Sequence, residues 1–399
     1  MGNKNISYFD ANGTTPVHTK VQQAITSSLQ HYGNPSTSSS LGLKTSSLIA
    51  ESTSTILSLI FHTTTGTLLY TSCGTESNQS AIQLVLQNWK GDGIPHVITS
   101  TVEHPATIKY LNFLETRREI SLSCVKPGLK GSVSPGEIIS AINDKTILIT
   151  LIYAQNETGS LNPLSKLRSL LPENSEIKIH VDASQAVSKV SCGIQEGGGL
   201  EGCDLITVTG HKFGAPKGIS ALWIREGFEV RKVEGGGIIF KGGGQMSGLR
   251  SGTENVPYIV GLAKAAECCV TSESGEFYAS IMKSFREEME LTLRGKVEFV
   301  YNCKSDTTGL PNTLSIGFRG LNVPSSKIIK MCEVKGLIIA AGSACETGKL
   351  SHVLKECSVE EEVGGCTLRV SCGFWNDVEE GKRGGRILGE VVKGLKEDE

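Results

Sequence analysis

Short β-rich segments alternate with helical segments through the first two thirds of the chain. Strands are predicted at Thr67–Ser72, His96–Thr101, Thr146–Ala154, Lys178–Asp182, Leu205–Thr209 and Ser220–Ile224. Helices are predicted between them, near Glu76–Asn88, Pro105–Arg118, Pro135–Ile142, Leu164–Leu171 and Ala183–Val187. Such alternation is typical of an α/β fold, in which a largely parallel sheet is covered by helices on both faces.

The pattern changes in the last third of the chain, after a predicted helix at Val256–Cys269. From about Phe277 onward, helical segments are mixed with short strands, which are predicted at Leu314–Phe318, Leu337–Ala341 and Thr367–Ser371. We expect this region to form a second, smaller α+β domain.

The charge balance excludes several classes of partner. The chain has 39 basic and 41 acidic residues and no block of like charge, so we expect neither a nucleic-acid nor a membrane partner.

The first residues lack the apolar stretch of a secretory signal, and the 12 cysteines are then expected to be reduced thiols. The predicted compartment is the cytoplasm, while organelle targeting stays open.

The cysteines do not have the paired CxxC spacing of a strong metal site, so we predict no metal. Cys73 is interpreted as a core residue, and so are Cys268 and Cys269, which are adjacent to each other, because cysteine often packs as a small apolar side chain.

A lysine and an aspartate lie at the ends of two predicted strands. Lys212 lies in a Gly- and Pro-rich turn directly after Leu205–Thr209, where a partly enclosed amine could form a Schiff base. Asp182 ends the strand before it, and a carboxylate there could keep the nitrogen of a pyridine cofactor protonated. Each also has a structural alternative: Lys212 could be a surface charge, and Asp182 could cap the following helix.

Two further segments carry polar groups between a strand and a helix. At the start of the helix after Thr67–Ser72, backbone N–H groups and the hydroxyl of Thr75 could bind a phosphate, or Thr75 could be a plain cap. Thr209 and His211, which flank the lysine turn, could add phosphate contacts. His104 follows another strand and could stack on a flat ring and relay protons near pH 7 as a catalytic residue, although a lone histidine is more often structural.

Taken in order, these segments resemble the cysteine desulfurase/selenocysteine lyase family of pyridoxal 5′-phosphate (PLP) enzymes, in the class V aminotransferase group. The resemblance runs from about residue 8 to 375. Its motifs are Asp10–Pro16, Gly33–Ser36, Gly74–Asn78, Glu103–His104, Asn156–Gly159, Asp182–Gln185, Gly210–Lys212, Arg250–Asn255 and Gly342–Cys345.

The resemblance implies the PLP-dependent transferase fold type I. It implies a large domain at residues 16–260 with a mainly parallel seven-stranded sheet, and a smaller α+β domain made of residues 1–15 and 261–399. It also implies a homodimer that converts L-cysteine to L-alanine and transfers sulfur to an acceptor protein. A selenocysteine lyase, acting on L-selenocysteine, is the alternative.

The same resemblance assigns roles to individual residues. Lys212 would bind PLP and move protons, His104 would stack on the ring, and Cys345 would receive the sulfur as a persulfide. The cofactor-binding residues would be Gly74, Thr75, His104, Asn156, Asp182, Gln185, Thr209, His211 and Lys212, with Thr253 from the other subunit. The substrate carboxylate would be bound by Arg369, with Asn156 between ring and substrate and Asn34 as a weaker candidate.

The chain departs from the family pattern at three places. The segment from Cys345 to His352 is about two residues shorter than the usual long-loop form, which bears on sulfur delivery. Phe374 stands where many relatives have a second arginine, and Gly13 replaces a common alanine.

Two other kinds of function remain open at this stage. The first is an aminotransferase or β-lyase that does not use Cys345. The second is a catalytically inactive partner protein, which the presence of both Lys212 and Asp182 disfavours.

Overall fold

The computed structural model describes residues 6–172, 175–230, 237–270, 272–303, 309–341, 350–360, 363 and 365–397, with the backbone alone at 272–277. Its largest element is a seven-stranded sheet with the order β2-β8-β7-β6-β5-β3-β4. The strands are β2 (Thr67–Thr71), β3 (His96–Ser100), β4 (Ser121–Val125), β5 (Thr146–Ile152), β6 (Lys178–Asp182), β7 (Leu205–Thr209) and β8 (Ser220–Ile224). β8 is antiparallel to β2 and β7, whereas the other neighbours pair in parallel.

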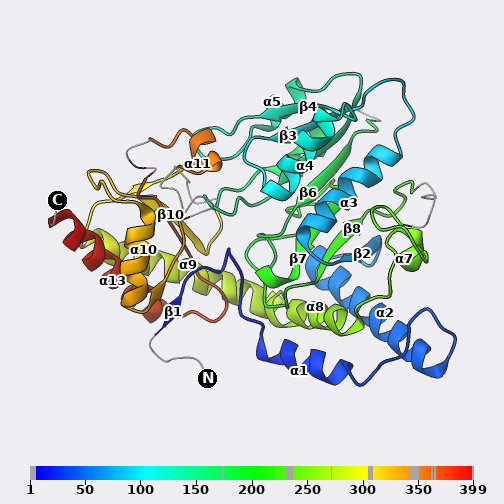
Figure 1. Cartoon of the computed structure of the whole chain (residues 1–399), viewed down its shortest axis with the longest axis horizontal. Coiled ribbons are helices and arrows are strands. Elements are labelled where there is room, and N and C mark those ends of the chain that lie inside the picture. Colours follow the sequence, from blue (N-terminus) through cyan, green and yellow to red (C-terminus); the bar gives the residue numbers. More distant parts are fainter. Residues whose placement is uncertain are drawn as a thin grey trace.

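Helices cover both faces of this sheet (Figure 1). The main covering helices are α1 (Thr19–Ser28), α2 (Ser40–Phe61), α3 (Gly74–Gln87), α4 (Pro105–Thr116) and α8 (Val256–Cys269). Successive residues of a strand point to opposite faces. In β8, for example, Trp223 belongs to the apolar cluster that includes α2 and α8, and Leu222 to the cluster that includes α3 and α4. The predicted α/β class with a mainly parallel sheet is confirmed.

Shorter helices connect these elements. They are α5 (Pro135–Ser140), η1 (Leu164–Lys166), α6 (Leu167–Leu170), η2 (Gly210–Lys212), α7 (Gln245–Gly248) and α11 (His352–Glu356). None of the described helices has both the length and the apolarity needed to cross a membrane.

A separate apolar core lies in the C-terminal part of the chain. It contains α9 (Ser272–Arg294), α10 (Ser325–Val334) and α13 (Val378–Glu397), which Figure 1 shows on the side away from the large sheet. A three-stranded antiparallel sheet joins β9 (Val300–Tyr301), β10 (Thr313–Gly317) and β12 (Leu368–Ser371). β1 (Ser7–Tyr8) pairs in parallel with β11 (Leu337–Ile338), and Phe9 is buried in the same core. The N-terminal segment thus packs with the C-terminal region; the limits 16–260 for the large domain stay a prediction.

The predicted helix at Ala183–Val187 is wrong, because these residues form turns. The backbone N–H of Ala186 donates to the carbonyl oxygen of Ala183, three residues earlier, as in a turn, and the carboxylate of Asp182 accepts a local hydrogen bond of 3.0 Å from the N–H of Ser184. Ser188 then has a φ of 67°, in the left-handed region that ends a helical path.

Candidate active site

The carboxyl ends of β2, β3, β5, β6 and β7 meet at one edge of the large sheet, because these strands run in the same direction. In open α/β sheets this edge is where ligands bind. A cavity of about 270 Å³ lies there. It is lined by Cys73, Gly74, Thr75, Asn78, His104, Ala106, Ile152, Asn156, Asp182, Ser184, Gln185, Thr209, His211 and Lys212. Nine of the predicted site residues therefore share one cavity.

Asp182 lies at the end of β6, and its side chain is buried. Each oxygen of its carboxylate accepts a hydrogen bond. Its Oδ2 accepts a hydrogen bond of 2.7 Å from Nδ2 of Asn78, and its Oδ1 accepts the bond from Ser184. Asn78 also donates to Thr107, at 3.1 Å. Sequence reasoning missed Asn78, although its position four residues after Gly74 places it on the same helix face.

The start of α3 provides an anion-binding cradle. Its first residue is Gly74, and the preceding Cys73 makes no side-chain cap, so the first backbone N–H groups are not capped by that residue. A Cβ on Gly74 would lie 2.5 Å from Oγ1 of Thr209, which is closer than a real contact. Glycine at this position therefore allows the start of α3 to lie close to the end of β7. The Thr209 hydroxyl shares a hydrogen bond of 2.8 Å with Ser184. Cys73 itself is exposed and lines the cavity, so its assignment to the core is wrong.

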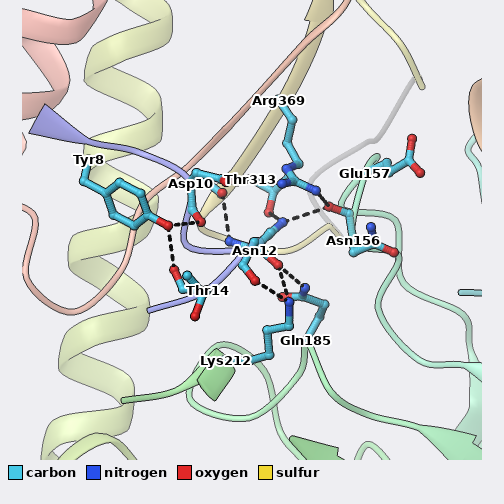
Figure 2. Close-up of polar contacts among 12 residues, drawn as sticks. Tyr8, Asp10, Asn12, Thr14, Asn156, Glu157, Gln185, Lys212, Thr313 and Arg369 are labelled. Atoms are coloured by element: carbon cyan, nitrogen blue, oxygen red, sulfur yellow. Dashed lines mark hydrogen bonds and ion pairs between the residues drawn. The ribbon is translucent and has the colours of Figure 1, made fainter. Parts of the chain in front are cut away.

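Lys212 reaches into the cavity from the η2 turn that follows β7. Its Nζ donates hydrogen bonds to the carbonyl oxygens of Asn12 and Gly13, both at 2.7 Å (Figure 2). Burial and, next, the positive charge of Arg369 lower the pKa of this amine to about 8, against the opposing effect of nearby carboxylates. A lysine with such a pKa is partly neutral near physiological pH, as a nucleophilic amine must be.

Two histidines that line the cavity also have lowered pKa values. Burial lowers the pKa of His104, the N-cap of α4, whose Nδ1 accepts a hydrogen bond of 3.1 Å from the N–H of Ala106. Burial, followed by the charge of Lys212, lowers the pKa of His211 to about 4. Both rings are therefore neutral at pH 7 and present flat, uncharged surfaces.

Gln185 occupies a position between Asn12 and Lys189. Its Nε2 donates a hydrogen bond of 2.9 Å to the carbonyl oxygen of Asn12, and its Oε1 accepts one of 2.9 Å from Nζ of Lys189. Lys189 is buried, and burial lowers its pKa to about 7. A role for Lys189 was not predicted, because nothing in the sequence indicates that the Lys189 amine points toward the site.

Arg369 projects from β12 toward Asn156. Its Nη1 donates to the carbonyl oxygen of Asn156 at 3.1 Å, and its Nη2 forms an ion pair of 2.6 Å with Asp10 (Figure 2). Asn12 connects the same parts of the chain, because its Nδ2 donates to the carbonyl oxygen of Asn156 at 3.1 Å and to Oγ1 of Thr313 at 2.9 Å. The N-terminal segment thus ties the C-terminal region to the cavity.

Of the predicted site residues that the structure describes, Asn34, Thr253 and Arg369 do not line the cavity. Asn34 and Thr253 are exposed, and Oδ1 of Asn34 accepts a local hydrogen bond of 3.0 Å from the N–H of Ser36. Cys345 lies outside the described residues. The segment that carries Thr253 is nevertheless close to the cradle, because Arg250 forms an ion pair of 3.0 Å with the buried Glu76 of α3.

The model of the class-V aminotransferase family matches residues 7–383. The chain belongs to this family. That assignment covers the sheet, the cavity and most of the C-terminal region. The predicted resemblance to the class V group is confirmed.

The chain is similar to proteins named as cysteine desulfurases and to a protein named as a selenocysteine lyase. A cysteine desulfurase from Nostoc sp. is 34% identical over 357 residues, which are 88% of this chain and 84% of that protein. A selenocysteine lyase from Bos taurus is 31% identical over 399 residues, covering 92% of this chain and 88% of that protein. Among solved structures, a NifS-like protein has a TM-score of 0.86 and 26% identity, covering 98% of this chain and 100% of that one.

Proposed function

We propose that this chain is a PLP-dependent enzyme that converts L-cysteine to L-alanine and transfers the sulfur, as a persulfide on Cys345, to an acceptor protein. One observation carries the proposal: the amine of Lys212, the carboxylate of Asp182 and the start of α3 line the same cavity. They come from three separate strand ends, and a PLP site needs all three groups.

The cavity fits the cofactor group by group. The buried carboxylate of Asp182 suits the protonated pyridine nitrogen, and the amide of Gln185, which lines the same cavity, suits the ring hydroxyl. The N-terminus of α3 with Thr75, Thr209 and His211 suits the phosphate, since backbone N–H groups and the helix dipole favour an anion there. The neutral ring of His104 suits stacking on the pyridine face.

PLP, when bound, withdraws electrons from the substrate α-carbon. The residues of the chain then have separate tasks. Lys212 takes up and returns a proton at the α-carbon, for which its lowered pKa is suited. Arg369 binds the substrate carboxylate, and Asn156, which receives a hydrogen bond from Arg369, lies beside it.

Cys345 is the proposed sulfur acceptor. Its thiolate attacks the sulfur of L-cysteine, so that an S–S bond forms while the carbon–sulfur bond breaks, and the electron pair left on carbon takes up a proton to give L-alanine. Described residues on both sides of residues 342–349 are anchored near the cavity. Ala340 pairs with the backbone of Arg369, and Oγ of Ser351 donates a hydrogen bond of 2.6 Å to Glu157, next to Asn156. This supports the assignment of Cys345.

A homodimer is part of the proposal. The exposed position of Thr253, on a segment held to α3 by the Arg250–Glu76 ion pair, suits a residue that serves the partner's phosphate site. The segment around Asn34 exposes large apolar side chains that a second subunit would cover. These are Leu29, Tyr32, Leu41 and Leu43.

The test compares Cys345→Ser with wild type, both loaded with cofactor, and uses Cys268→Ser in α8 as the matched control. We expect alanine formation from L-cysteine to fall by about 100-fold or more in Cys345→Ser, while the cofactor absorbance is retained. Cys268→Ser should match wild type, because this half-buried cysteine is on a helix outside the cavity. Full activity of Cys345→Ser would contradict the persulfide step and favour a β-lyase.

Selenocysteine lyase is the second candidate, favoured by the likeness to the Bos taurus protein. Turnover of L-cysteine and L-selenocysteine by the purified protein separates the two. Comparable turnover of cysteine supports the desulfurase, whereas a selenium preference of several orders of magnitude supports the lyase.

A further inference from the structure

The arginine that we assign to the substrate carboxylate already has a carboxylate bound to it. Nη2 of Arg369 lies 2.6 Å from Oδ1 of Asp10, and the Arg369 side chain is only 9% exposed. Its Nη1 is engaged by the carbonyl oxygen of Asn156. Its Nε is buried and has no hydrogen-bond partner among the described residues. Asp10 therefore satisfies one N–H of the guanidinium and leaves another unsatisfied.

A tight turn directs Asp10 onto the arginine. The backbone N–H groups of Gly13 and Thr14 donate to the carbonyl oxygen of Asp10, at 3.0 and 3.3 Å. The hydroxyl of Tyr8 donates to the carbonyl oxygens of Asp10 and Thr14, at 3.1 and 3.0 Å, and so fixes both ends of the turn (Figure 2). The backbone of the turn is held independently of the Asp10 carboxylate.

Gly13 makes the position of that carboxylate possible. A Cβ on Gly13 would lie 2.4 Å from Oδ2 and 2.9 Å from Cγ of Asp10, closer than real Cβ contacts come. The φ of Gly13 is not in the left-handed region, so an alanine there would be accepted by the backbone and would displace only the Asp10 side chain. The ion pair of Asp10 with Arg369 thus depends on the absence of a side chain at residue 13.

We propose that Asp10 is an internal competitor for the substrate carboxylate at Arg369, and that Gly13 is the residue that permits the competition. This inference rests on the proposed function, in which Arg369 binds that carboxylate. A second carboxylate at the same guanidinium meets like-charge repulsion until Asp10 moves away. Binding of an α-amino acid then exchanges one carboxylate for another, whereas an amine without a carboxylate leaves Asp10 in place. Asp10 is a specificity-determining residue that weakens the binding of every α-amino acid.

The experiment measures dissociation constants by calorimetry on cofactor-loaded protein, so that no turnover is needed. The ligands are L-alanine, the proposed product, and ethylamine, which is the same molecule without its carboxylate. The variants are Gly13→Ala, which displaces Asp10, and Asp10→Asn, which removes its charge. Arg369→Gln tests the arginine itself, and Gly394→Ala, where a Cβ would meet no atom within 4 Å, is the matched glycine control.

We expect Gly13→Ala and Asp10→Asn to bind L-alanine about tenfold more tightly than wild type, with ethylamine binding unchanged. Arg369→Gln should bind L-alanine about 100-fold more weakly, and Gly394→Ala should match wild type. If Gly13→Ala and Asp10→Asn bind L-alanine no better than wild type while Arg369→Gln loses it, Asp10 orients the arginine and the inference is wrong. If Arg369→Gln binds L-alanine like wild type, the carboxylate site of the proposed function is wrong as well.

Discussion

Nδ2 of Asn78 lies 2.7 Å from Oδ2 of Asp182 and donates a hydrogen bond to it, across 104 residues of sequence. The contact joins the helix that supplies the anion cradle to the strand end that supplies the buried carboxylate. It therefore couples the two ends of the proposed cofactor site, and Asn78 should matter to cofactor affinity although it is not expected to react.

Replacement of Asn78 by alanine should weaken cofactor binding. Asp182 would keep the Ser184 N–H but lose the amide that holds its other oxygen. Because hydrogen bonds to charged groups contribute about 1.5–3 kcal/mol, we expect affinity for PLP to fall by about 10- to 100-fold in an absorbance titration of the cofactor-free protein. Gln83→Ala, which removes a side chain of the same helix bonded to Tyr110, is the control. Equal affinities in Asn78→Ala and Gln83→Ala would contradict the assigned role.

The rate at which cofactor-free protein reacts with PLP should depend on pH through Lys212. The neutral amine is the nucleophile, so the rate rises as the proton is lost and levels off above the pKa. Since the pKa of Lys212 is lowered to about 8 by burial and by Arg369, we expect the half-maximal rate near pH 8 in stopped-flow absorbance measurements. A rate still rising steeply at pH 9.5 would mean that the amine behaves as an ordinary exposed lysine.

Glu103 should make the protein less stable as the pH rises. It is buried beside Oγ of Ser100, which donates a hydrogen bond of 2.5 Å to it, and burial raises its pKa from 4.5 to about 8. Between these two values the folded state holds a proton that the unfolded state has released, so the free energy of unfolding falls with rising pH. Accumulated between pH 4.5 and pH 8, the loss is about 5 kcal/mol.

Glu103→Gln keeps the size of the side chain and removes its titration. Urea unfolding at pH 5, 6.5 and 8 should therefore show the variant gaining stability relative to wild type as the pH rises, and the difference cancels the contributions of other titrating groups. A difference between the two proteins that does not change with pH would mean that Glu103 is ionised in the folded state across this range.

The strand ends that build the cavity could be predicted from the sequence because apolar runs such as Leu205–Thr209 stop abruptly at polar residues. Elements without that contrast were not predicted. β4 is an edge strand whose residues are mostly not buried, and α2 is rich in Ser and Thr, which are weak helix formers. In α2, hydroxyls such as that of Thr53 bond to the carbonyl oxygen one turn earlier, which the sequence does not reveal.

Within the site, nine of the residues that line the cavity could be predicted from the sequence, but the residues that support them could not. Asn12, Asn78 and Lys189 act through partners that the fold brings together, such as Thr313 for Asn12, 301 residues away. The pairing of Asp10 with Arg369 likewise depends on the strand pairing that places residues 10 and 371 side by side. Such contacts follow from tertiary packing and leave no local pattern.

In the proposed function, Lys212 is the lysine that binds the cofactor in the cavity beside Asp182. The most direct test is to load the protein with PLP, reduce it with borohydride and map the modified peptide by mass spectrometry. We predict a reduced PLP adduct on Lys212 and none after Lys212→Ala. An adduct on the nearby buried Lys189 instead, or no covalent adduct on any lysine, would contradict the account.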